Sequence, residues 1–159
     1  MRGRGLGAGD RLGTPRPNGD ATREVARLTE TQRQLRGSGS NYWADQVAIQ
    51  IAEANAWIAL AKGDGASARK LMTSAADLED SIEKLPLTPG PIVPAREQLG
   101  DLLLELKHPA EALRQFEASL QQSPGRRNAL LGARTAAELS NNQQKADFYA
   151  IEIQKLPER

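Results

Sequence analysis

Apolar side chains recur at every third or fourth position along most of this chain, which is the period of an α-helix with one buried face. The first such run covers residues 21–36 and ends at a Gly-Ser-Gly-Ser stretch. The second covers residues 42–62 and ends at Gly63, and the third covers residues 66–85. Each run spans about four or more helical turns. The pattern therefore predicts three helices in the first half of the chain.

Proline dominates the segment that follows, with four prolines in the nine residues 86–94. Because proline removes a backbone donor and restricts the residue before it, residues 85–92 are expected to form a rigid connection. The helical period then returns in four shorter runs, over residues 93–107, 109–122, 126–140 and 142–156. Together the two halves predict an all-α protein of about seven helices.

Composition supports a helical fold and narrows the classes of partner. Only 4% of the residues are aromatic, and alanine, the best helix former, is abundant. The helices are therefore expected to approach closely through small side chains. The formal net charge is +1, which gives no overall field to attract nucleic acid or an anionic membrane surface. We therefore expect neither nucleic acid nor a membrane as the partner.

The first 20 residues combine six glycines, two prolines and four arginines with no apolar period. Residues 1–20 are therefore expected to be a disordered tail, and residues 21–159 a single helical domain. No stretch reaches the roughly 18 apolar residues of a membrane-spanning helix, and the N-terminus lacks the apolar core of a secretion signal. We expect a soluble chain. A cytoplasmic location is favoured only by this lack of targeting segments, because the absence of cysteine leaves the compartment open.

Few residues in this sequence could support catalysis. His108 is the only histidine and cysteine is absent, which excludes a multi-histidine or cysteine metal site and a thiolate nucleophile. Glu105 and His108 form a Glu-x-x-His pair, but the di-iron sites that use this pair need a second one. We therefore expect no enzyme activity, no metal and no cofactor. The simpler interpretation of His108 is a solvated residue at a helix end.

A repeat with a period of 34 residues is visible in the second half of the chain. Ala112 and Ala146 are separated by this interval, and so are the two predicted helix joints at Lys107 and Asn141. The unit that contains the first of these joints, residues 93–124, has the Leu-Gly pair, large apolar residue, small alanine, aromatic, leucine and proline of a known pattern, as Leu99, Gly100, Leu103, Ala112, Phe116, Leu120 and Pro124. This unit resembles the tetratricopeptide repeat family, and Ala146 continues the match into the next unit.

The resemblance implies an all-α array of antiparallel helical hairpins that winds into a right-handed superhelix. The repeat-like units would cover about residues 41–82, 93–124 and 127–156. The match is strong in the central unit and looser at both ends. The segment also resembles the C-terminal part of longer bacterial proteins of this family, which implies that the chain is a fragment.

In this family the first helix of each hairpin lines a concave groove, and the resemblance therefore implies a set of groove residues. Taken hairpin by hairpin they are Gln50, Glu53, Trp57 and Leu60; Glu97, Asp101 and Glu105; and Asn128, Leu131, Thr135 and Glu138. Such a face would be acidic and would suit a basic or amphipathic segment of a protein or peptide. It lacks the lysine and asparagine with which one subclass of the family clamps a C-terminal carboxylate. The alternative is that these acids only keep the concave wall soluble.

Two further groups each have two interpretations. Trp57 is either an anchor for a ligand or, more simply, a residue that packs against the first helix together with Trp43. Arg126 and Arg127 are either an anion site at the start of a helix or, more simply, a solvated pair.

The expected function is non-catalytic binding of a protein or peptide by a scaffold. The alternative is a structural or self-associating module of a larger protein.

Overall fold

The computed structural model describes residues 19–83 and 91–157, and every regular element within these ranges is a helix. The ranges contain seven: α1 (Gly19–Gly37), α2 (Asn41–Ala61), α3 (Gly65–Ser81), α4 (Ala95–Glu105), α5 (Pro109–Gln122), α6 (Arg127–Leu139) and α7 (Gln143–Gln154). The predicted all-α class is confirmed. The predicted tail is two residues too long, because Gly19 and Asp20 belong to α1. The rest of that tail and most of the predicted connection over residues 85–92 lie outside the described ranges.

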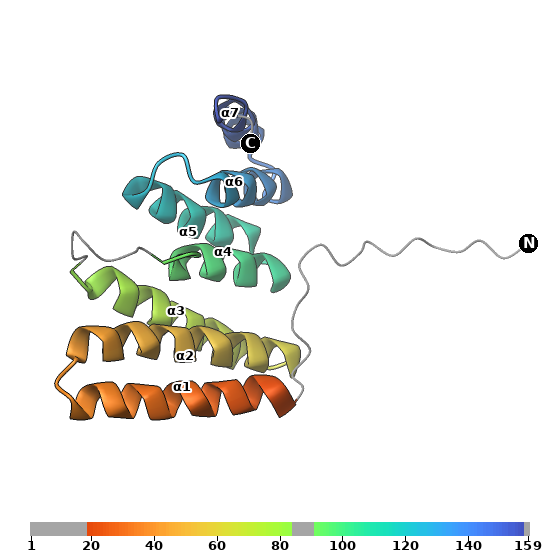
Figure 1. Ribbon diagram of the computed structural model, residues 1–159. Helices are drawn as coiled ribbons and strands as arrows, with labels where there is room; N and C mark the ends of the chain where they lie inside the picture. Colours follow the sequence, from red (N-terminus) through yellow and green to blue (C-terminus); the bar gives the residue numbers. More distant parts are fainter. Residues whose placement is uncertain (1–18, 84–90, 158–159) are drawn as a thin grey trace, which may run out of the picture.

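The helices are stacked in chain order from α1 to α7 (Figure 1). Each helix contacts the next one along the chain, and α4 also contacts both α2 and α6. These three helices therefore share one side of the stack. Helix α1 lies along α2 and buries none of its own residues. None of the described helices is long and apolar enough to cross a membrane.

Left-handed residues and a polar cap set the turns in the second half of the chain. Lys107 and Asn141 are non-glycine residues with positive φ, 64° and 57°. Asn142 follows, and its side chain accepts a hydrogen bond from the backbone N–H of Lys145 at 3.2 Å, which caps the start of α7. The two turns that lie 34 residues apart thus share one unusual backbone conformation.

Helix α4 has no capping side chain of its own, because its N-cap residue is Pro94. Glu79 of α3 supplies the missing acceptor, since its Oε2 accepts a hydrogen bond from the Ala95 N–H at 2.8 Å. The next residue, Arg96, forms an ion pair with Asp80 of α3 at 2.7 Å. These contacts fix the start of α4 against the end of α3.

Phe116 of α5 is the largest fully buried side chain in the described core. Its ring lies between Gly100 of α4 and Gly132 of α6: a Cβ atom at Gly100 would lie 2.6 Å from the ring, and one at Gly132 would lie 2.4 Å from it. Both distances are far inside van der Waals contact. The ring therefore fills the space that the two glycines leave between α4 and α6. The other repeat positions are buried (Leu99, Leu103, Ala112 and Ala146), half-buried (Leu120) or exposed (Pro124).

Replacing Gly132 by alanine tests this packing. The added methyl group would force the Phe116 ring or α6 to move, and overpacking of this kind costs about 1–3 kcal/mol. We expect Gly132→Ala to lower the free energy of unfolding by this amount, measured by urea denaturation. Gly37→Ala is the matched control, because nothing lies within 4 Å of its Cβ position. Equal effects of the two substitutions would contradict the close contact.

Candidate binding cleft

A cleft of about 620 Å³ opens beside the first half of α2. Its walls come from α1, α2, the end of α3, residues 91–93 and α4. A volume of this size lies in the range of sites that hold a ligand. Most of the surface inside the cleft is apolar, and the apolar residues that line it are Leu35, Tyr42, Trp43, Val47, Ile49, Pro91, Ile92 and Val93.

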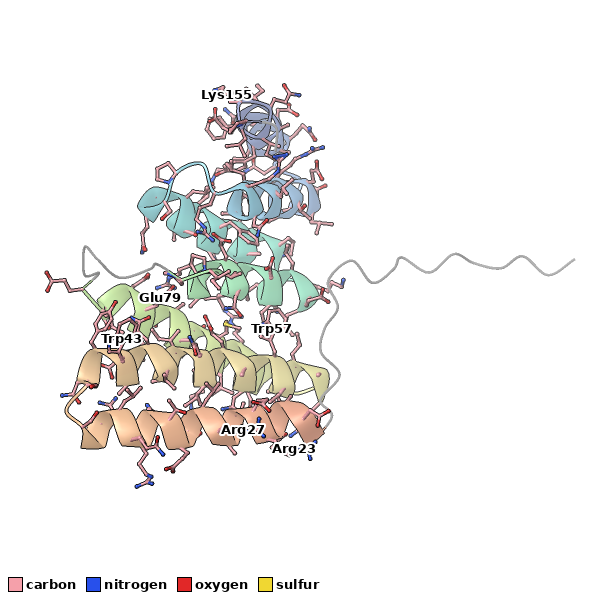
Figure 2. The ribbon with its side chains drawn as sticks, viewed as in Figure 1. Arg23, Arg27, Trp43, Trp57, Glu79 and Lys155 are labelled. Carbon is pink, nitrogen blue, oxygen red and sulfur yellow. The ribbon has the colours of Figure 1, made fainter. Side chains whose placement is uncertain are left out.

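Three of the apolar side chains at the cleft are exposed, although their burial would be favourable. Ile92 is 93% exposed, Trp43 is 49% exposed and Val93 is 36% exposed. The Trp43 ring packs edge-on against the ring of Tyr42, with the centroids 5.2 Å apart. Figure 2 shows Trp43 on the same side of the molecule as Glu79. This grouping of apolar side chains around a concave surface makes the cleft the candidate binding site.

Gln98 of α4 organises the polar part of the cleft. Its Oε1 accepts a hydrogen bond from the Nε1–H of Trp57 at 2.9 Å. Its amide group is then free to donate to the Val93 carbonyl, at 3.5 Å, and to the Glu53 carboxylate. One side chain therefore joins α2 to α4 and holds residues 91–93 beside both helices.

Glu53 of α2 is an ionisable group of the cleft with no cation beside it in the described ranges. Burial raises its pKa to about 7, and the negative charge of Glu79 adds to this rise, whereas the hydrogen bond with Gln98 opposes it. No lysine or arginine within the described ranges forms an ion pair with Glu53, and none lines the cleft. Glu53 is therefore about half ionised near neutral pH.

Glu97 does not line an open groove, and that expectation is wrong. The residue is 1% exposed, and its carboxylate forms an ion pair with Arg126 from the start of α6 and accepts a hydrogen bond from the Ser119 hydroxyl at 3.2 Å. Arg126 also donates to the Ile92 carbonyl at 3.0 Å. Arg126 is therefore a structural cation, and the interpretation of Arg126 and Arg127 as a solvated pair is wrong for Arg126.

The remaining predicted groove residues are split between the cleft and the rest of the surface. Asp101 is half-buried; burial, followed by repulsion from Glu97 and Glu105, raises its pKa to about 6. Glu105 is exposed. Leu60 is half-buried. Of the predicted groove residues only Gln50 and Glu53 line the cleft; those on α6 are exposed but are not part of it, namely Asn128, Leu131, Thr135 and Glu138.

Trp57 has a neighbour that the sequence did not predict. Its indole N–H bonds to Gln98 of α4, and no ring contact joins it to Trp43 within the described ranges. The indole N–H of Trp57 is therefore directed at α4, and packing of the two tryptophans against the first helix stays a prediction. Trp57 is half-buried with its donor already used, so it acts as a contact between helices.

Sequence reasoning missed most of the cleft. Trp43 was expected to pack against the first helix, Gln98 had no assigned role, and Ile92 and Val93 were assigned to a connection or a helix start. The available signal was the pair of large apolar residues between Pro91 and Pro94, in a segment that offers no helical face to bury them. Such a pair in a connection indicates a surface contact.

Neither a metal centre nor a known relative identifies the site. Within the part of the chain that the structure describes, no group of three or more His, Cys, Asp or Glu residues is placed to hold a metal ion. Comparison with known proteins finds no matching family model, no matching curated protein and no matching solved structure. The chemistry of the cleft must therefore be inferred from its own geometry.

Glu53→Gln should stabilise the protein in a pH-dependent way. Because the pKa in the fold lies above the usual 4.5, the penalty of the ionised carboxylate is absent below pH 4.5, grows between pH 4.5 and 7 and is complete above pH 7. We expect Glu53→Gln to raise the free energy of unfolding by about 1–2 kcal/mol at pH 8 and by almost nothing at pH 4.5, measured by urea denaturation. Glu24→Gln on exposed α1 is the matched control. A Glu53→Gln effect that is the same at both pH values would contradict the burial of this charge.

Glu97→Lys should destabilise the fold itself, so its effect should be seen in the protein without any ligand. The substitution breaks a buried ion pair and places two cations together, which costs at least about 3–5 kcal/mol. Glu105→Lys, on the same helix but exposed, should change stability by less than about 0.5 kcal/mol. Thermal unfolding of the two variants measures the difference, and equal melting temperatures would show that Glu97 is accessible after all.

Proposed function

We propose that this chain is a non-catalytic binding module that holds a segment of another protein, or a peptide, in the cleft beside α2. The observation that carries the proposal is the group of exposed apolar side chains, Trp43, Ile92 and Val93, around a space able to enclose a partner's side chain. A partner that covers these side chains removes their apolar surface from water, which is favourable by about 25 cal/mol of free energy per Å² buried. Because Gln98 and Arg126 already hold residues 91–93, binding needs little reorganisation of the site.

We further propose that the helices form a repeat array of the tetratricopeptide type. Two observations support this finer assignment. The contacts of α4 with α2 and α6 are those expected of the first helices of successive hairpins. The left-handed turns at Lys107 and Asn141 lie one 34-residue period apart, each between the two helices of a predicted hairpin. Arrays of this kind present extended surfaces to proteins and peptides.

A basic or amphipathic segment is the partner that the charges favour. The cleft contains the carboxyl groups of Glu53 and Glu79, and the described residues that line it include no lysine or arginine. A cation on the partner would therefore meet complementary charge next to apolar walls.

Self-association is the second candidate function, because a separate surface favours it. Four large apolar side chains are exposed on α6 and α7: Leu131, Leu139, Phe148 and Ile151. Ile151 follows Glu117 by 34 residues, and Glu117 is covered by Lys145 at 2.6 Å and by Tyr149 at 2.9 Å. Residues of α7 thus cover Glu117 on α5, whereas the equivalent residue on α7, Ile151, is exposed.

Selection from a random library of 12-residue peptides on the full chain tests the proposal. We expect peptides to be enriched on the wild-type protein and lost on Gln50→Trp, which places a large ring at an exposed position inside the cleft. Ala26→Trp adds the same ring on exposed α1 and should leave the selection unchanged. Peptides that bind Gln50→Trp as well but fail on Ile151→Asp would assign binding to α6 and α7 instead.

A further inference from the structure

We propose that the Glu53 carboxylate pairs with a lysine or arginine of the bound segment, and that the cleft therefore selects a large apolar residue with a cationic residue three to five positions away. This inference rests on the proposed function, because it assigns a ligand chemistry to the same cleft. The sequence predicted a groove that is acidic over its whole length. The present inference assigns recognition of the partner's cation to a single carboxylate, that of Glu53.

The geometry of α2 sets the spacing. Trp43, Val47, Gln50 and Glu53 follow one another along the side of the helix that lines the cleft, with the apolar residues first and the carboxylate last. At about 1.5 Å per helical residue, Glu53 lies about 9 Å beyond Val47 and about 15 Å beyond Trp43 along the axis. An extended peptide covers such distances in about three to five residues. An apolar side chain held near Trp43 and Val47 thus places a residue at that interval beside Glu53.

Nothing already in the described cleft can neutralise Glu53. The groups that face it are the Glu79 carboxylate from α3 and the Gln98 amide from α4. Glu79 is itself engaged, since it accepts the Ala95 N–H at 2.8 Å. A cation on the partner is therefore the counterion that this site can gain.

The arginines on the helices that form the cleft are paired with other carboxylates. Arg36 at the end of α1 contacts Asp45 at 2.6 Å, and Arg96 contacts Asp80 at 2.7 Å. Arg126 is paired with Glu97. Moving any of these cations to Glu53 would break an existing ion pair. The partner's cation is free of that cost.

The pairing makes binding depend on pH. Burial holds the pKa of Glu53 at about 7 in the free protein, and a cation beside the carboxylate favours its ionised form. Below pH 7 the site must therefore lose a proton before it can form the pair. With a lysine or arginine on the peptide, whose charge is constant in this range, affinity should fall by up to about tenfold between pH 8 and pH 6.

The experiment uses the full chain, the random 12-residue library and one enriched peptide that contains no histidine. We expect wild-type selection to enrich lysine or arginine three to five residues from a large apolar residue, and Glu53→Gln to lose this preference. Fluorescence anisotropy of the labelled peptide at pH 6 and pH 8 should show the pH dependence in the wild type and in Glu24→Gln, and no pH dependence in Glu53→Gln. The glutamine keeps the size of the side chain and its hydrogen bond with Gln98.

The outcomes separate this inference from the proposed function. Enriched peptides that lack a cation, or that bind Glu53→Gln and the wild type equally at pH 8, would overturn the role of Glu53. If those peptides were still lost on Gln50→Trp, the cleft would remain the binding site. Absence of any peptide that depends on the cleft would remove both proposals.

Discussion

The ion pair between Arg126 and Glu97 is the contact on which the candidate site depends. Glu97 is buried, and a buried carboxylate is tolerated only with a partner and hydrogen bonds, which Arg126 and the Ser119 hydroxyl supply. The same guanidinium donates to the Ile92 carbonyl, and Gln98 donates to the carbonyl of the next residue. Residues 91–93 are thus held by α4 and by the residue that caps α6. The apolar side chains of Ile92 and Val93 lie at the surface of this held segment.

Burial also decides how much of the acidic surface is charged. Glu97 is neutralised by Arg126, and the pKa values of Asp101 and Glu53 are raised to about 6 and about 7. Three carboxyl groups that would all be charged in water therefore present much less than three charges to a partner near neutral pH. A weaker general field means that attraction over long distances contributes little. Under the proposed function, recognition would depend on contacts made inside the cleft, where apolar area and one ionisable group lie together.

The sequence predicted the elements well and the site poorly, for the same physical reason. Helix positions follow from local periodicity and from breakers, so the seven helices could be located, and the largest error is the end of the third helix, predicted at residue 85 and observed at Ser81. The site depends on pairs that are distant in the chain, such as Trp57 with Gln98 and Glu97 with Arg126. The resemblance placed Glu97 at an open groove position, but the arginine at the start of α6 covers it. A repeat pattern predicts where a residue lies on its own helix. It does not predict which side chain of the next helix will cover that residue.

The two exposed apolar surfaces of this chain differ in how they can select a partner. The cleft beside α2 is concave and contains Glu53 without a cation, so shape and charge can both discriminate. On α6 and α7 the neighbouring charges are already paired within each helix, Arg134 with Glu138 at 2.8 Å and Lys155 with Glu152 at 2.5 Å. That surface therefore offers mainly apolar area and shape for discrimination. A selective contact in the cleft and a less selective one on α6 and α7 would suit a scaffold that recognises one segment while it associates with a larger assembly.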